Sequence, residues 1–178
     1  MKAIVRETYG PPDVLHLEDV PVPTLGDRDV LVRVHAASAN AGDWHLLRGT
    51  PLPFRLVAGL RIPKFKIIGA DIAVRVEAVG RNVTRFRPGH DVFGELSGCG
   101  FGAYAEFAAA PEQALALKPA NLSFEEAATL PTAGCTALQG LRKGRIQRGQ
   151  RVLINGASGG VGTFAVQIAV AQSNPVFP

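Results

Sequence analysis

The sequence predicts an α/β chain in two parts: a β-barrel domain over residues 1–120 and, over residues 121–178, the first strand and helix of a nucleotide-binding sheet. Three observations predict this division. Short apolar runs alternate with Gly and Pro turns through the first part, which is typical of a closed or nearly closed barrel. A helix-capping pattern then opens at Ser123. Finally, a glycine-rich turn separates an apolar run from a helical pattern, as at the start of an open α/β sheet.

The first part contains several short strands. In the second strand, Leu15 and Leu17 alternate with polar residues, which predicts one buried and one exposed face. Residues 44–49 favour one or two helical turns ended by a glycine, whereas residues 51–66, with three prolines, predict a long loop. The strands are expected over residues 2–6, 14–20, 30–36, 67–79, 91–94, 103–109 and 114–118.

The second part begins with two predicted helices. Ser123 and Glu126 form an S-x-x-E capping box, in which each side chain caps the other residue's backbone N–H. The first helix should run to about Leu130, because Pro131 interrupts it. A second helix is expected over about residues 133–143. The boundary between the two domains is therefore placed near residue 120.

A glycine motif follows the apolar run at 152–154, which predicts a fully buried strand. Three glycines in G-x-x-G-x-x-G spacing lead from that run into a helix that includes residues 164–169. Their missing β-carbons and the N–H groups of the helix N-terminus suit a diphosphate, although an ordinary glycine-rich turn has the same appearance. The residues expected at the diphosphate are Gly156, Ser158, Gly159, Gly160, Val161 and Gly162.

Little sequence follows this motif. Asn174-Pro175 should end the helix, and only residues 170–178 remain where a dinucleotide site needs a second strand with a residue that reads the adenosine ribose. The sequence therefore predicts an incomplete nucleotide-binding domain in a C-terminally truncated chain.

Composition excludes several classes of protein. The 178 residues are 47% hydrophobic and 19% charged with a formal charge of +4, which is typical of a globular domain. The basic residues are scattered without aromatic interleaving, so we do not expect nucleic acid as a partner. Cys99 and Cys135 form no disulfide framework or metal spacing. Neither a signal peptide nor a membrane-spanning run is present, so we expect no membrane partner and a cytoplasmic location.

Four ordered motifs resemble the medium-chain dehydrogenase/reductase superfamily, in its zinc-free quinone-oxidoreductase-like branch. Within it, the chain is similar to the mitochondrial reticulon-interacting oxidoreductases and their bacterial homologues. The resemblance implies a GroES-like barrel followed by an incomplete Rossmann domain, and it extends to about Ala169. The motifs are V-x-x-V-G-x-x-V-x-x-F-x-x-G from Val76 to Gly89, Gly102 to Glu106, Leu130 to Ala137, and Gly156 to Gly162.

The resemblance also implies that the chain binds no zinc. Zinc-dependent relatives place Cys or His ligands where this sequence has Asn40, Ala70 and Thr132. Amide, methyl and hydroxyl groups are poor or impossible zinc ligands. Cys135 is close to the third position and is expected to be a small buried residue.

In the resembled family, the loop from Asn40 to Asp43 lies against the nicotinamide, and Thr136 contacts it from the second domain. His45 takes a position from which an imidazole could protonate the product of hydride addition. Two alternatives stay open: His45 as a half-buried helix histidine bonded to backbone, and Asp43 as an organiser of its loop. Tyr104 is expected to pack in the barrel. Asp71 is not assigned, because Val74 replaces a family glycine and could crowd this region.

The function implied is a zinc-independent NAD(P)H-dependent oxidoreductase. It would transfer hydride to a quinone, an enone or another electron-poor C=C or carbonyl group, such as an aldehyde, with NADPH preferred by resemblance only. The full-length protein is a possible homodimer. The alternative is a non-catalytic fragment, a barrel with an incomplete cofactor domain, acting at most as an interaction or remnant module.

Overall fold

The chain forms two compact units. The structure, a computed structural model, describes residues 1–177, and its contacts divide them into a first unit, Met1–Ala128, and a second unit from Thr129 onward. The first unit holds the strands of the predicted barrel. The second holds the predicted strand, glycine turn and helix.

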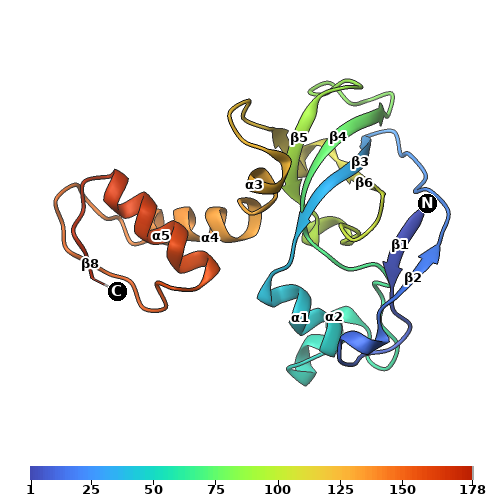
Figure 1. Ribbon diagram of the computed structural model, residues 1–178, viewed down its shortest axis with the longest axis horizontal. Coiled ribbons are helices and arrows are strands. Elements are labelled where there is room, and N and C mark those ends of the chain that lie inside the picture. The colour runs from blue at the N-terminus through green and yellow to red at the C-terminus, as the bar shows by residue number, and fades with distance from the viewer. Residues whose placement is uncertain (178) are drawn as a thin grey trace. The chain divides into compact units, whose positions relative to one another are not determined.

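The first unit is built on a curved five-stranded antiparallel sheet (Figure 1). Register shifts interrupt the pairing of β3 with β4 at two places, and such bulges increase the local twist and bend of a strand. In spatial order the strands are β6 (Phe107–Pro111), β3 (Asp29–Ser38), β4 (Asp71–Val79), β5 (Asp91–Glu95) and β7 (Leu115–Leu117).

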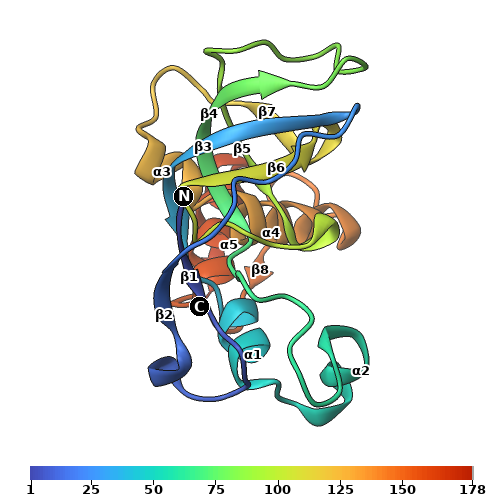
Figure 2. The same cartoon turned by 90° about the vertical axis from the view of Figure 1, so that its right-hand side faces the viewer.

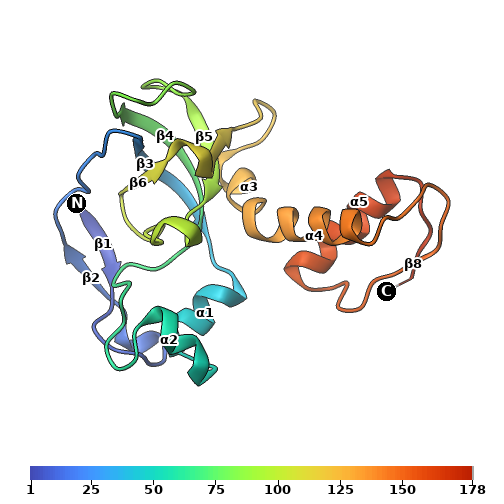
Figure 3. The ribbon, with the colours of Figure 1, turned by 180° about the vertical axis from the view of Figure 1, so that it is seen from behind.

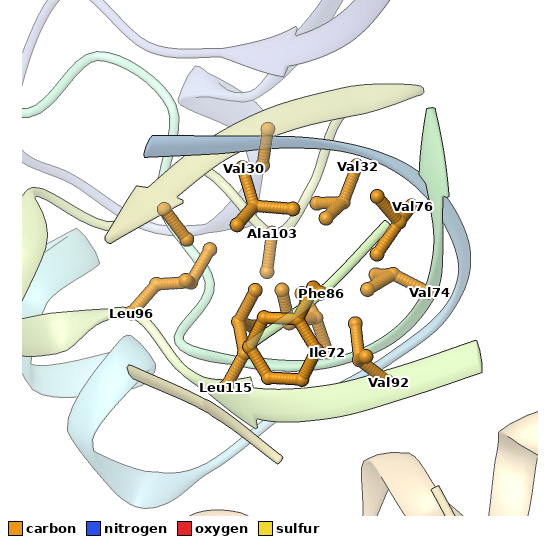
Figure 4. Close-up of a cluster of buried hydrophobic side chains, with 12 residues drawn as sticks. Val30, Val32, Ile72, Val74, Val76, Phe86, Val92, Leu96, Ala103 and Leu115 are labelled. Carbon is orange, nitrogen blue, oxygen red and sulfur yellow. The ribbon is translucent and has the colours of Figure 1, made fainter. Parts of the chain in front are cut away.

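The core of this unit lies inside the curve of the sheet (Figure 4). Alternate residues of each strand point into it, because successive side chains of a strand lie on opposite faces. Phe86 enters from the loop between β4 and β5. The buried strand residues include Val30, Val32, Ile72, Val74, Val76 and Val92.

A separate hairpin precedes the sheet. Strands β1 (Lys2–Val5) and β2 (His16–Asp19) pair antiparallel, and β1 contributes the buried side chains Ala3 and Val5. All four residues of β2 are exposed, and Leu17 is 65% exposed. The prediction of a half-buried second strand is therefore wrong. Strand β2 is the outer strand of the hairpin, and no other element covers the face that carries Leu17 within residues 1–177. Alternation in the sequence identifies an apolar face but does not show that another layer packs on it.

Two helices and several single turns lie between the strands. Helix α1 (Ala41–Arg48) ends at Gly49, as predicted. The prediction of a loop over 51–66 is partly wrong, because a 3-10 turn (Leu52–Phe54) runs directly into the short helix α2 (Arg55–Ala58). Figure 2 shows α1 and α2 at one end of the unit, away from β4 and β7. The remaining 3-10 turns span Pro12–Val14, Ser97–Cys99 and Glu112–Ala114.

Helix α3 (Phe124–Ala128) confirms the predicted capping box. The Ser123 N–H donates to Glu126 Oε2 at 2.8 Å, and the Glu126 N–H donates to Ser123 Oγ at 3.1 Å. The helix packs on the sheet through buried alanines at 127 and 128 beside Ala73 of β4. It ends at Ala128, because α4 (Pro131–Lys143) begins with a proline at its first position.

The second unit is a small βαβ arrangement. Strand β8 (Val152–Leu153) leads into α5 (Gly160–Ala171), and β9 (Val176–Phe177) returns parallel to β8. The expectation that no second strand follows the helix is therefore wrong. Helix α5 ends at Ala171, three residues before the predicted stop at Asn174-Pro175, and the residues after the proline return beside β8. Figure 3 shows α5 crossing α4.

Burial in β8 also differs from the prediction of a fully buried strand. Val152 and Ile154 face the core formed with α4 and α5, which includes Ala137 and Ala165. Leu153 points to the opposite face and is 78% exposed. A parallel strand is buried on both faces only when helices cover both sides of its sheet, and within residues 1–177 both helices of this unit pack on one side.

Candidate functional site

The site in the first unit starts where β3 gives way to α1. Asn40 has an extended backbone and is the N-cap residue of α1, and Asp43 is the third residue of that helix. The Asn40 N–H donates to Asp43 Oδ2 at 2.8 Å. A carboxylate in the first turn also stabilises a helix through the helix dipole. The structure thus brings together two of the predicted catalytic residues, and the contact seen for Asp43 is the loop-organising one.

Asp43 is a buried carboxyl group. Burial raises its pKa above the usual aspartate value, and the nearby charge of Asp71 adds to the rise. The Asn40 N–H, the Tyr104 hydroxyl and the Gly69 N–H favour the charged form and offset part of this effect. Asp43 Oδ1 has no partner that meets full hydrogen-bond geometry. The Tyr104 hydroxyl and the Gly69 N–H therefore act on this carboxylate from less favourable positions.

A second carboxylate, Asp71, holds the side chain of Asn40. Asn40 Nδ2 donates to Asp71 Oδ2 at 3.1 Å, and Ser38 Oγ donates to the same oxygen at 3.4 Å. Asp71 is fully buried, as the first residue of β4 and opposite Ser38 of β3. Sequence reasoning missed its role, although a charged residue inside the apolar run 67–79 was a signal, because a buried charge requires partners.

Val74 does not disturb this arrangement. Its side chain is buried in the sheet core beside Ile72 and Val76, which lie on the same face of β4 (Figure 4). Asp71 and Ala73 belong to the opposite face. The crowding considered for a valine at this position therefore does not reach Asp71.

Tyr104 connects two of the buried clusters of the unit. Its ring packs against both the sheet core and the cluster under α1 that contains Leu46 and Leu47. Its hydroxyl donates to the Ser38 carbonyl at 3.4 Å. Burial and the nearby Asp43 raise the pKa of Tyr104 above its usual range. Tyr104 packs in the barrel, as expected, and its hydroxyl also joins the polar group around Asn40.

His45 is exposed and bonds to the backbone of Thr50, not to the polar group around Asn40. Its Nδ1 lies 2.9 Å from the Thr50 carbonyl oxygen, and its ring meets the Trp44 ring edge-on at 4.8 Å. A carbonyl oxygen only accepts hydrogen bonds, so Nδ1 carries a proton and donates it. This leaves Nε2 as the nitrogen that can exchange a proton with another group. The bond to backbone agrees with the alternative considered for this residue, but the side chain is exposed and not half-buried.

The glycine turn lies in the second unit, between β8 and α5. Gly156 has φ of +78°, a left-handed conformation that glycine adopts without strain, and its carbonyl accepts the Gly159 N–H at 3.0 Å. A Cβ on Gly162 would lie 2.1 Å from that carbonyl oxygen. Gly159 is the N-cap residue of α5, so the first N–H groups of this helix have no acceptor within the helix. Ser158, Gly160 and Val161 are exposed around the same helix start.

Two neighbouring residues of α4 complete the predicted set. Thr136 is exposed on α4, in the same unit as the glycine turn. Cys135 is exposed too, so the prediction of a small buried cysteine is wrong. The residue lies on the side of α4 away from Ala133 and Ala137, which are two of the buried positions of this helix.

The three positions that the family resemblance matches to zinc ligands carry no suitable ligand set. Asn40 directs its amide at Asp71, Ala70 is buried, and Thr132 has a hydroxyl only. Among residues 1–177, no group of three or more His, Cys, Asp or Glu side chains gathers where it could hold a metal. Over the same residues, no helix is both long and apolar enough to cross a bilayer.

Comparison with known proteins adds three findings. The family model of the alcohol dehydrogenase GroES-like domain matches residues 26–120. The chain is 37% identical, over 95% of its length, to the 2-methylene-furan-3-one reductase of Solanum lycopersicum, of which it covers 44%. It is 38% identical, over 95% of its length, to the chloroplast envelope quinone oxidoreductase homolog of Arabidopsis thaliana, of which it covers 52%.

A solved structure matches as well. The quinone oxidoreductase of Coxiella burnetii superposes with a TM-score of 0.88 and is 36% identical, over 99% of this chain and 55% of its own. This chain therefore spans about half the length of the relatives that it matches.

Proposed function

Because the chain belongs to the medium-chain dehydrogenase/reductase superfamily, in its quinone-oxidoreductase-like branch with an alcohol dehydrogenase GroES-like domain, we propose that it is a zinc-independent, nicotinamide-dependent reductase of quinones or enones. The observation that carries the proposal is the glycine turn at the start of α5. Gly156 is required there by its left-handed backbone, and Gly162 is required by its close contact with the Gly156 carbonyl oxygen. The helix N-terminus is open to an anion.

The residues of the turn fit a dinucleotide. The N–H groups of Gly160, Val161 and Gly162 would hold its diphosphate, with the hydroxyl of exposed Ser158 beside them. By family resemblance, Thr136 and the segment from Asn40 to Asp43 would contact the nicotinamide, and NADPH would be preferred. When bound, the reduced nicotinamide supplies hydride to the substrate.

The chain's own residues would then position the substrate and move a proton. Asp43 and Asp71 fix the Asn40 backbone and side chain respectively, so this segment is organised before any ligand binds. His45 would deliver a proton from Nε2 to the reduced product, because its Nδ1 is engaged by Thr50. The small-molecule substrate class, a quinone, enone or aldehyde, is inferred from the names of the relatives and from family resemblance.

Binding and activity are testable with one pair of variants. NADPH and NADH are titrated calorimetrically into the 178-residue chain, and reduction of a panel of quinones and enones is followed at the nicotinamide absorbance. Gly159→Asp keeps a preferred N-cap residue but adds a negative charge to the diphosphate site. The matched control, Gly159→Ser, is a neutral N-cap.

We expect Gly159→Asp to keep its melting temperature and lose NADPH binding, with Gly159→Ser binding more tightly than Gly159→Asp. Equal binding by both variants would contradict a diphosphate at this turn. No binding by the unmodified chain would favour the second candidate, a barrel with an inactive cofactor unit. The exposure of Leu153 on the uncovered face of β8 favours that candidate.

A further inference from the structure

The segment of residues 51–62, called here the apolar loop, carries an unusual set of exposed side chains. It comprises the 3-10 turn, α2 and the residues that follow them. Five large apolar side chains on it are each between 67% and 74% exposed. Single exposed apolar residues are common, but a run of this kind in one segment marks an interaction site. The five are Leu52, Leu56, Val57, Leu60 and Ile62.

The loop is fixed to the unit from its inner side. Phe54 and Ala58, four residues apart, pack into the cluster under α1. The Tyr9 hydroxyl lies 2.8 Å from the Ala58 carbonyl oxygen, and Arg55 stacks over the Tyr9 ring while its Nε donates to the Gly49 carbonyl at 2.9 Å. Since the inward positions are already filled, the five exposed side chains have no core to turn into within residues 1–177.

The charge around the loop is of one sign. Between residues 48 and 66 the sequence has five cationic residues and no Asp or Glu. Arg55 is held against Tyr9, and Lys66 forms an ion pair with Glu7 at 2.9 Å. Exposed cations remain at Arg48, Arg61 and Lys64. Arg48 lies over the ring of the chain's one tryptophan, Trp44, which is itself exposed.

We propose that the apolar loop docks this protein onto an anionic lipid bilayer. Apolar side chains among cations are the combination that binds such a surface, the first entering the boundary of the acyl chains and the second attracting the headgroups. Trp44, which lies under Arg48, is a residue type that suits the same interface. A second copy of this chain is a poorer partner, because a symmetric contact through this face would set its cations against their own copies.

The proposal replaces the expectation of no membrane partner. That expectation rested on the missing membrane-spanning run, which excludes a crossing segment and not a peripheral contact. The docking proposal does not depend on cofactor binding, so the failure of either proposal leaves the other standing.

Vesicle binding tests the proposal on the full chain. Co-sedimentation with phosphatidylcholine vesicles, with and without phosphatidylserine, measures partition, and the emission of Trp44 reports entry into the interface. We expect binding and a blue shift with phosphatidylserine only. Raising the ionic strength to about 1 M, where the Debye length falls to about 3 Å, should release most of the bound protein from the vesicles.

Two variants and a control locate the contact. The double variant Leu56→Asp/Val57→Asp should weaken partition at least about tenfold, because two apolar side chains leave the interface. Arg61→Ser/Lys64→Ser should weaken it about fivefold for each cation removed. The control, Leu117→Asp, alters an exposed leucine of β7 outside the loop and should bind as the unmodified chain does.

Three results would overturn the proposal. The first is no binding to phosphatidylserine vesicles, and the second is equal loss in the loop variants and the control. The third is a change of oligomeric state in Leu56→Asp/Val57→Asp without lipid, which would identify the loop as a contact between copies of the chain.

Discussion

Asn40 and Asp71, which are far apart in sequence, are joined by a hydrogen bond of 3.1 Å from the amide Nδ2 to the carboxylate Oδ2. The bond links the start of α1 to the start of β4. The orientation of a residue expected at the nicotinamide is thus set by a buried charge.

A double-mutant cycle measures this bond. We expect Asn40→Ala and Asp71→Ala to be non-additive, with a coupling energy of about 1–3 kcal/mol, because hydrogen bonds to charged groups lie in that range. Urea unfolding gives each free energy. Asn82→Ala, at an exposed turn, is the control and should add to Asp71→Ala within about 0.5 kcal/mol. An additive Asn40–Asp71 pair would contradict the bond.

The raised pKa of Asp43 predicts a pH dependence. The folded state holds this proton more tightly than the unfolded state, so the contribution is fully present below the unfolded pKa and is lost as pH rises through the folded pKa. In Asp43→Asn that loss disappears. The free energy of unfolding of the unmodified chain, relative to the variant, should therefore fall as pH rises from about 4. A difference that is constant or rises over this window would show that the pKa is not raised.

The ring of His45 should carry its neutral-state proton on Nδ1. The bond to the Thr50 carbonyl requires this tautomer, and ring ¹⁵N chemical shifts identify it directly. His16 is the comparison, because its Nε2 faces Glu18 at 3.4 Å and should hold the proton there instead. A ring protonated mainly on Nε2 at His45 would remove the argument that Nε2 exchanges the proton during reduction.

Two glycines of the second unit should respond oppositely to alanine. Gly162→Ala would place a Cβ 2.1 Å from the Gly156 carbonyl oxygen, so we expect a loss of about 1–3 kcal/mol from overpacking. At Gly140, in the middle of α4, an added Cβ has no atom within 4 Å. Gly140→Ala should therefore gain about 0.5–1 kcal/mol of helix stability. Thermal and urea unfolding check both values, and a tolerated Gly162→Ala would exclude the close packing of the turn.

Local features of the chain were predictable because the interactions that form them span only a few residues. The Ser123 capping box, the glycine end of α1 and the turn at Gly156 each depend on neighbouring backbone groups and conformational freedom. The short strands of the first unit follow from Gly and Pro turns and apolar alternation. These patterns recur in any chain with the same local residues.

What only the tertiary structure decided was the environment of each element. Leu17 and Leu153 are exposed, and Cys135 lies on the open side of its helix, because the layers that could cover them are not present among residues 1–177. Likewise, Asp71 reaches Asn40 only through the pairing of β3 with β4. Burial and long-range contacts depend on which distant segment packs against a residue, and the local pattern around that residue does not contain this information.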